Sequence, residues 1–213
     1  MHGQVELYDN DMNIWDTIEY FESLIADYAG SKYAVATDSC TNSIFLCLKY
    51  LKAAGVVDVP KRTYISVPCS VIHAGCKIKF TDEAWSGVYR LNPYPIIDGA
   101  QRFTQGMYVK DTYHCISFHS KKILSIGRGG MILTDDKESV KWFKQARYDG
   151  RADLMYNDIA DINVVGWHMY MTPEQAIRGI EQFYKTPKIN NDSGTDKSYK
   201  IDLSALKGFK IYE

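Results

Sequence analysis

The chain has 213 residues with 46% apolar and 24% charged side chains, which is an ordinary balance for a globular protein with a buried core. A formal net charge of −1, without a basic or acidic block, argues against binding to nucleic acid or a membrane surface through bulk charge. Residues 1–13 lack the apolar core of a signal peptide, and no stretch reaches the roughly 20 apolar residues that span a bilayer. Five cysteines without a CxxC pair favour reduced, mostly buried thiols over disulfides or a structural zinc site. We therefore expect a cytoplasmic protein.

Helical and strand patterns alternate along the chain. Apolar residues recur at helical spacing over 14–28, and Gly30 is a helix stop. The polar turn 38–43 separates a short apolar strand from a second helix. The predicted strands are 32–37, 63–67, 77–80, 95–97, 114–117 and 131–134, and the predicted helices are 14–28, 44–51, 69–74, 138–148 and 173–184.

This alternation predicts an α/β protein with a mainly parallel, mixed sheet and helices on both faces. We expect residues 1–185 to form one large domain. Residues 186–213 begin with a stretch rich in Asn, Asp, Ser, Gly and Lys, which favours a polar, loosely ordered tail. In sheets of this kind ligands bind at the carboxyl ends of strands, so the polar segments after the strands are candidate site residues.

The turn Ser39-Cys40-Thr41 joins a predicted strand to a predicted helix. Backbone N–H groups at a helix N-terminus, together with two hydroxyls, form a potential anion site. The alternative is an ordinary helix N-cap, because Ser and Thr favour that position.

Two further candidates follow strands. Asp98 comes directly after an apolar strand, where a buried carboxylate needs a partner such as a protonated ring nitrogen; the alternative is another helix N-cap. Lys122 follows Ser117 to Lys121 and precedes a glycine-rich turn that begins at Gly127. Partial burial would lower the pKa of Lys122 and make its neutral amine a nucleophile. The alternative is an exposed Lys-Lys pair in a turn.

In this order, the segments resemble the DegT/DnrJ family of pyridoxal phosphate (PLP)-dependent sugar aminotransferases, which have the aspartate aminotransferase fold. Residues 117–130, SFHSKKILSIGRGG, are similar to the family string SFHPTKxLxxGEGG, which places the reactive lysine at 122. The other similar segments are 20–22, 38–41, 60–64, 74–76, 97–101, 147–151 and 166–175.

The resemblance implies a role for each candidate. Lys122 would form the Schiff base with PLP and later move the proton, while Asp98 would pair with the ring nitrogen. The implied PLP-binding residues are Ser39, Cys40, Thr41 and Ser117 at the phosphate, Gln101 at the phenolic oxygen, Tyr64 at the ring, and His168 at the phosphate of a neighbouring subunit. His119, which would line the ring near Lys122, is the third implied catalytic residue. For Tyr64 the alternative is a core aromatic residue, and for His119 a structural histidine.

The implied reaction transfers an amino group from an amino acid such as glutamate to a keto sugar, typically nucleotide-linked, in a homodimer with shared active sites. The chain departs from the family between Phe80 and Pro95, where members carry a further helix and strand, and after Tyr184, where they continue into a small domain. A catalytically degenerate or regulatory PLP-binding protein is therefore an alternative. A PLP-dependent sugar dehydratase is another, although that branch replaces the reactive lysine with histidine.

Overall fold

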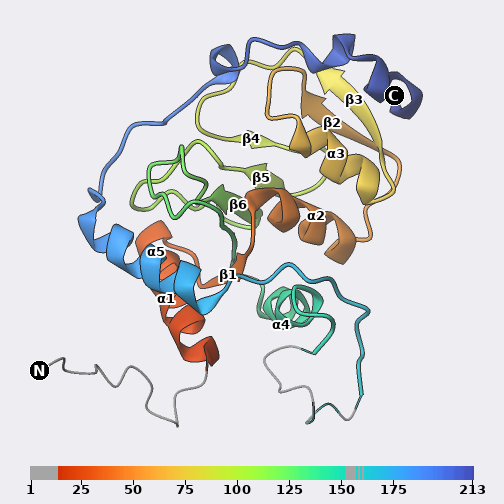
Figure 1. The fold of residues 1–213 in the computed structure, drawn as a ribbon. Helices are drawn as coiled ribbons and strands as arrows, with labels where there is room; N and C mark the ends of the chain where they lie inside the picture. Colours follow the sequence, from red (N-terminus) through yellow and green to blue (C-terminus); the bar gives the residue numbers. More distant parts are fainter. Residues whose placement is uncertain (1–13, 152–156, 158, 160) are drawn as a thin grey trace, which may run out of the picture.

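The computed structural model describes residues 14–151, 157, 159 and 161–213 (Figure 1). Residues 1–13, on which the signal-peptide argument depends, lie outside this range. No helix among the described residues is both long and apolar enough to cross a membrane. The helices are α1 (Ile14–Ala29), α2 (Cys40–Tyr50), α3 (Ser66–His73), α4 (Lys137–Ala146) and α5 (Pro173–Lys185).

A five-stranded sheet has the order β1 (Tyr33–Thr37), β7 (Gly130–Thr134), β6 (Tyr113–Ser117), β5 (Ile96–Asp98) and β4 (Tyr89–Arg90). The α/β class with a mixed sheet is confirmed. Within this sheet, however, only β5 and β6 pair in parallel, and the other three pairs are antiparallel. The segment from β6 to β7 contains no crossover helix, so the chain returns antiparallel to itself.

Helices cover both faces of this sheet, as expected. On one face, α1 and α5 pack against inward side chains such as Ile116 and Met131. On the other face, α2 and α4 pack against Cys115 and Ile132. Most predicted elements are confirmed, and α1 ends before Gly30, which has the positive φ of +84° that favours glycine. All five cysteines are free, and all but Cys69 are buried.

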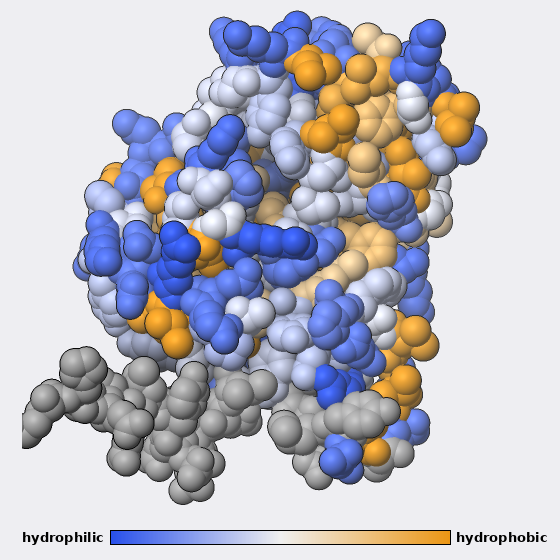
Figure 2. Space-filling view, viewed as in Figure 1, coloured by the Kyte–Doolittle hydropathy of each residue, from blue (hydrophilic) through white to orange (hydrophobic). Residues whose placement is uncertain are grey.

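A small parallel pair, β2 (Val56–Pro60) and β3 (Lys77–Thr81), lies beside α3. The predicted strand at 63–67 is wrong, because α3 already begins at Ser66. Pro68 fits there because the first turn of a helix needs no backbone N–H from it. Exposed apolar side chains gather over this end of the molecule, as Figure 2 shows, and they include Val56 and Ile65.

Residues 186–213 run along the outside of the molecule from α5 to β2 and β3 (Figure 1). They contain three short 3-10 helices, Asp196–Ser198, Leu203–Ala205 and Lys207–Tyr212. The backbone N–H of Leu203 donates to the carbonyl of Lys61, and the rings of Phe80 and Phe209 lie 5.7 Å apart. Leu203 and Phe209 are buried, so this polar segment is packed onto the domain at several points.

Candidate active site

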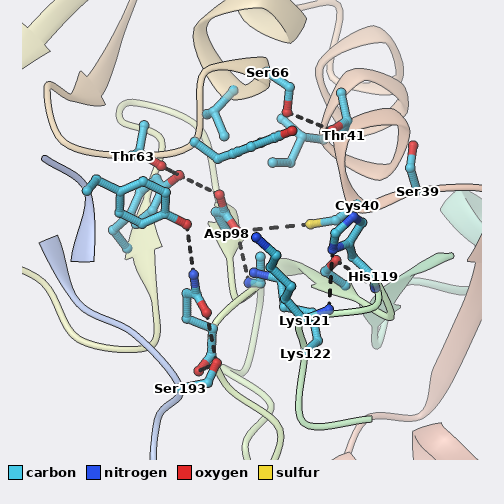
Figure 3. Close-up of a pocket in the computed structure, with 18 of the residues that line it drawn as sticks. Ser39, Cys40, Thr41, Thr63, Ser66, Asp98, His119, Lys121, Lys122 and Ser193 are labelled. Atoms are coloured by element: carbon cyan, nitrogen blue, oxygen red, sulfur yellow. Dashed lines mark hydrogen bonds between the residues drawn. The ribbon is translucent and has the colours of Figure 1, made fainter. Parts of the chain in front are cut away.

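One cavity of about 800 Å³ lies where β5, the N-terminus of α2, the loop after β6 and residues 193–199 meet (Figure 3). Its lining is rich in hydroxyl, amide and charged side chains. It includes every predicted site residue except His168, namely Ser39, Cys40, Thr41, Tyr64, Asp98, Gln101, Ser117, His119 and Lys122.

The N-terminus of α2 forms one wall of the cavity. Ser39 is the helix N-cap, since its hydroxyl accepts a hydrogen bond of 3.2 Å from the backbone N–H of Asn42. The Thr41 hydroxyl lies 2.7 Å from that of Ser66. Gly130 on β7 passes so close that a Cβ there would lie 2.3 Å from the nitrogen of Cys40, so only glycine fits. The N-cap alternative is therefore correct for Ser39. The N-terminus of α2 also lines the cavity, where the helix dipole would favour an anion.

Asp98 ends β5 and is only 5% exposed. One carboxylate oxygen accepts a hydrogen bond of 2.9 Å from the backbone N–H of Ala100, and the other accepts one from the hydroxyl of Tyr89. Burial raises the pKa of Asp98, and the hydrogen bond from Tyr89 opposes that rise. No helix follows within residues 99–112, all of which are described, so the helix N-cap alternative for Asp98 is wrong.

Lys122 lies in the loop between β6 and β7, where its backbone N–H donates to the carbonyl of His119 at 2.9 Å. Its side chain is partly buried, and burial lowers the pKa of its amine, although the negative charge of Asp98 opposes this effect. Lys121, by contrast, is exposed. The two adjacent lysines therefore have different surroundings, which excludes the alternative of an exposed Lys-Lys pair.

The side chain of Gln101 is held by the C-terminal segment. Its amide nitrogen donates to the Tyr199 hydroxyl at 2.8 Å, and its amide oxygen accepts from the Ser193 hydroxyl at 2.8 Å. Nearby, Asp192 forms an ion pair of 2.8 Å with Arg102. Ser193 and Tyr199 were not predicted as site residues, because nothing in a polar segment indicates which distant side chain it will contact.

Two of the three predicted site residues with ring side chains line the cavity, and the third does not. Tyr64 lines the cavity and is 60% exposed, so the core-aromatic alternative is wrong. His119 also lines the cavity and is exposed. His168 does not line it. Its ring nitrogen Nδ1 lies 2.9 Å from the carboxylate of Asp149, and its side chain is 67% exposed.

The donor set suits a phosphorylated aromatic aldehyde with a basic ring nitrogen. Asp98 is a buried carboxylate whose donors are the Tyr89 hydroxyl, the Ala100 N–H and, at 4.0 Å, the Cys40 thiol. All three are uncharged, so a protonated ring nitrogen would supply the missing positive charge. Lys122 presents an amine whose pKa is lowered, as reaction with an aldehyde requires. The N-terminus of α2 offers an anion site for the phosphate. PLP contains these three groups.

The model of the DegT/DnrJ/EryC1/StrS aminotransferase family matches residues 7–87 and 105–212. The fold and this match establish that the chain belongs to that family, whose cofactor is PLP. Residues 88–104, which carry Asp98 and Gln101, lie outside the match.

Among known proteins, the spore coat polysaccharide biosynthesis protein SpsC of Bacillus subtilis is 25% identical over 218 residues, covering 78% of this chain and 56% of SpsC. The fold is similar to that of Spr1654 from Streptococcus pneumoniae in its PLP form, with a TM-score of 0.67, 16% identity and coverage of 80% and 59% of the two chains. A DegT/DnrJ/EryC1/StrS aminotransferase from Brucella abortus has a TM-score of 0.65, 18% identity and coverage of 79% and 58%. The chain thus spans less than two thirds of the length of these relatives.

Proposed function

We propose that this chain binds PLP in the cavity and acts in the cytoplasm. It would transfer an amino group from an amino acid such as glutamate to a nucleotide-linked keto sugar. The observation that carries the proposal is that Asp98 and Lys122 both line one cavity. A buried carboxylate and a partly buried amine meet there at the N-terminus of α2. Family membership and the relation to SpsC, a polysaccharide biosynthesis protein, support a sugar substrate.

Each catalytic side chain has a defined task in this proposal. PLP, when bound, supplies an electron sink that stabilises negative charge on the carbon attached to the transferred nitrogen. Asp98 keeps a proton on the ring nitrogen by remaining ionised beside it. Lys122 would hold the cofactor covalently and, once released, would carry the proton to and from the reacting carbon. Burial lowers the pKa of Lys122 and so favours the neutral amine that can accept this proton.

The remaining cavity residues bind and orient the cofactor. Ser39, Ser117, the hydroxyl of Thr41 and the N–H groups at the start of α2 would hold the phosphate. Gln101 would donate to the phenolic oxygen with the amide hydrogen that Tyr199 leaves free. Tyr64 and His119 would cover the ring, since both line the cavity and are exposed.

We also propose a homodimer in which His168 reaches the cofactor phosphate of the partner subunit. Its exposure and its position outside the cavity of its own chain fit that role. Residues 1–185 would form the cofactor-binding domain, and the segment 186–213 would complete the wall of the cavity through Ser193 and Tyr199.

A half-reaction tests the proposal. Purified protein loaded with PLP is mixed with glutamate, and the absorbance of the cofactor is followed with Lys122→Ala as the matched control. Conversion of the PLP spectrum to that of the aminated cofactor in the wild-type protein alone is expected. Bound PLP that no amino acid converts would instead identify a catalytically degenerate or regulatory protein, and a protein that binds no PLP would overturn the proposal.

A further inference from the structure

The hydroxyl of Tyr89 donates a hydrogen bond to the Asp98 carboxylate. The contact follows from the pairing of β4 with β5, in which Tyr89 lies directly opposite Asp98. Opposed residues of antiparallel strands present their side chains on the same face, so the two groups meet. Both belong to residues 88–104, which the family model does not match.

A second hydroxyl, that of Thr63, adds a further hydrogen bond to this contact. An ionised carboxylate can only accept hydrogen bonds, so the single hydroxyl hydrogen of Tyr89 points to Asp98. The Thr63 hydroxyl lies 2.5 Å from the Tyr89 oxygen and must therefore donate its own hydrogen to it. Donation from Thr63 polarises the Tyr89 hydroxyl and strengthens its bond to Asp98.

Both residues that supply these hydroxyls are buried. Tyr89 is 5% exposed, Thr63 is 4% exposed, and the Tyr89 ring lies 4.9 Å from that of Trp85. Loss of a hydrogen bond donated to a buried carboxylate disfavours its charged form, so the Tyr89 hydroxyl helps Asp98 to ionise. The other titratable groups that interact with Asp98 are Cys40 on α2, Cys115 on β6, Lys122 in the loop and Tyr199 in the C-terminal segment.

We propose that Tyr89 is a positioning residue for Asp98, whose carboxylate it keeps ionised and oriented toward the cofactor ring nitrogen. The Asp98 oxygen that accepts from Tyr89 has no second donor among the described residues and retains a lone pair for the ring nitrogen, whereas the other oxygen accepts from the Ala100 N–H and, at 4.0 Å, from the Cys40 thiol. The inference rests on the proposed function, because it assigns Tyr89 a part in holding PLP.

The test measures the dissociation constant of PLP by absorbance at a series of pH values, without any turnover. Tyr89→Phe removes only the hydroxyl that donates to Asp98. Thr63→Val removes only the hydroxyl that donates to Tyr89. Tyr94→Phe is the matched control, because the Tyr94 hydroxyl bonds to the backbone of Ala54 at 2.8 Å and does not contact Asp98. Circular dichroism and thermal unfolding of each variant show whether it is folded.

Without the Tyr89 hydroxyl, Asp98 takes up a proton at higher pH. The acid limit of PLP binding should therefore rise by about one pH unit in Tyr89→Phe. It should rise by less in Thr63→Val and stay unchanged in Tyr94→Phe. A wild-type acid limit in Tyr89→Phe would overturn the inference, and if that variant does not fold, a wild-type limit in Thr63→Val would do so. Failure of the wild-type protein to bind PLP at any pH would instead overturn the proposed function, and this inference with it.

Discussion

The amide nitrogen of Gln101 donates a hydrogen bond of 2.8 Å to the hydroxyl of Tyr199, 98 residues further along the chain. The ring of Tyr199 lies 5.7 Å from that of Trp85, which also lines the cavity. Through this contact the C-terminal segment fixes the orientation of a side chain to which we assign cofactor binding.

Replacing Tyr199 with Phe should therefore weaken PLP binding. The loss of one hydrogen bond, about 1 kcal/mol, corresponds to an increase of about fivefold in the dissociation constant. A fluorescence titration with PLP measures it. Tyr184→Phe is the matched control, because among the described residues the Tyr184 hydroxyl bonds to that of Tyr20, and neither residue lines the cavity. Equal affinities in Tyr199→Phe and the wild-type protein would show that Gln101 needs no support from this segment.

The parts of the site that follow from local sequence were predictable. A hydroxyl-rich turn between a strand and a helix, an acidic residue after an apolar strand, and a lysine before a glycine-rich turn each have a local physical meaning. They led to Ser39, Asp98 and Lys122, which the structure brings to one cavity.

Contacts between distant segments were not predictable from local patterns. Tyr89 reads as an ordinary aromatic residue until β4 pairs with β5 and places it opposite Asp98. The segment that contains Tyr199 is polar, and polarity alone does not reveal that its side chains reach Gln101. The strand predicted at 63–67 failed because β-propensity there was overridden by a helix that packs against α2.

Replacing Asp98 with Asn should leave a folded protein that retains cofactor but reacts slowly. An amide has a similar shape but no negative charge, so it does not keep the ring nitrogen protonated. We expect rates of the glutamate half-reaction to fall by about 10²–10⁴-fold, the range for single catalytic groups. Stopped-flow absorbance measures these rates. Near-normal rates would mean that Asp98 serves only to organise the turn after β5.

The lowered pKa of Lys122 predicts a pH dependence of stability in the cofactor-free protein. A lysine whose pKa is lower in the folded state than in the unfolded state binds fewer protons when folded. Its contribution to the free energy of unfolding therefore rises with pH between these two pKa values. Urea unfolding should therefore show a steeper rise above neutral pH in the wild-type protein than in Lys122→Met. Lys121→Met, at an exposed position, should match the wild-type protein. Identical slopes in all three proteins would show that Lys122 is fully solvated.

The shared-site dimer predicts that His168 affects a cavity it does not line. Light scattering should find a dimer at micromolar concentration, and His168→Ala should bind PLP more weakly while remaining dimeric. Asp149→Asn serves as a comparison, since it removes the charge next to His168 but leaves the ring. A monomer that holds PLP tightly would exclude the shared site.

The central claim is that Lys122 is the residue that holds PLP, and its neighbour Lys121 provides an internal control. Both lysines line the cavity, but Lys121 is exposed, whereas Lys122 is partly buried, has a pKa lowered by burial and interacts with Asp98. Reduction of the PLP-loaded protein with borohydride, followed by peptide mapping, measures the point of attachment directly. We expect a pyridoxyl group on Lys122 and its loss in Lys122→Ala but not in Lys121→Ala. A pyridoxyl group on Lys121, or on neither lysine, would contradict it.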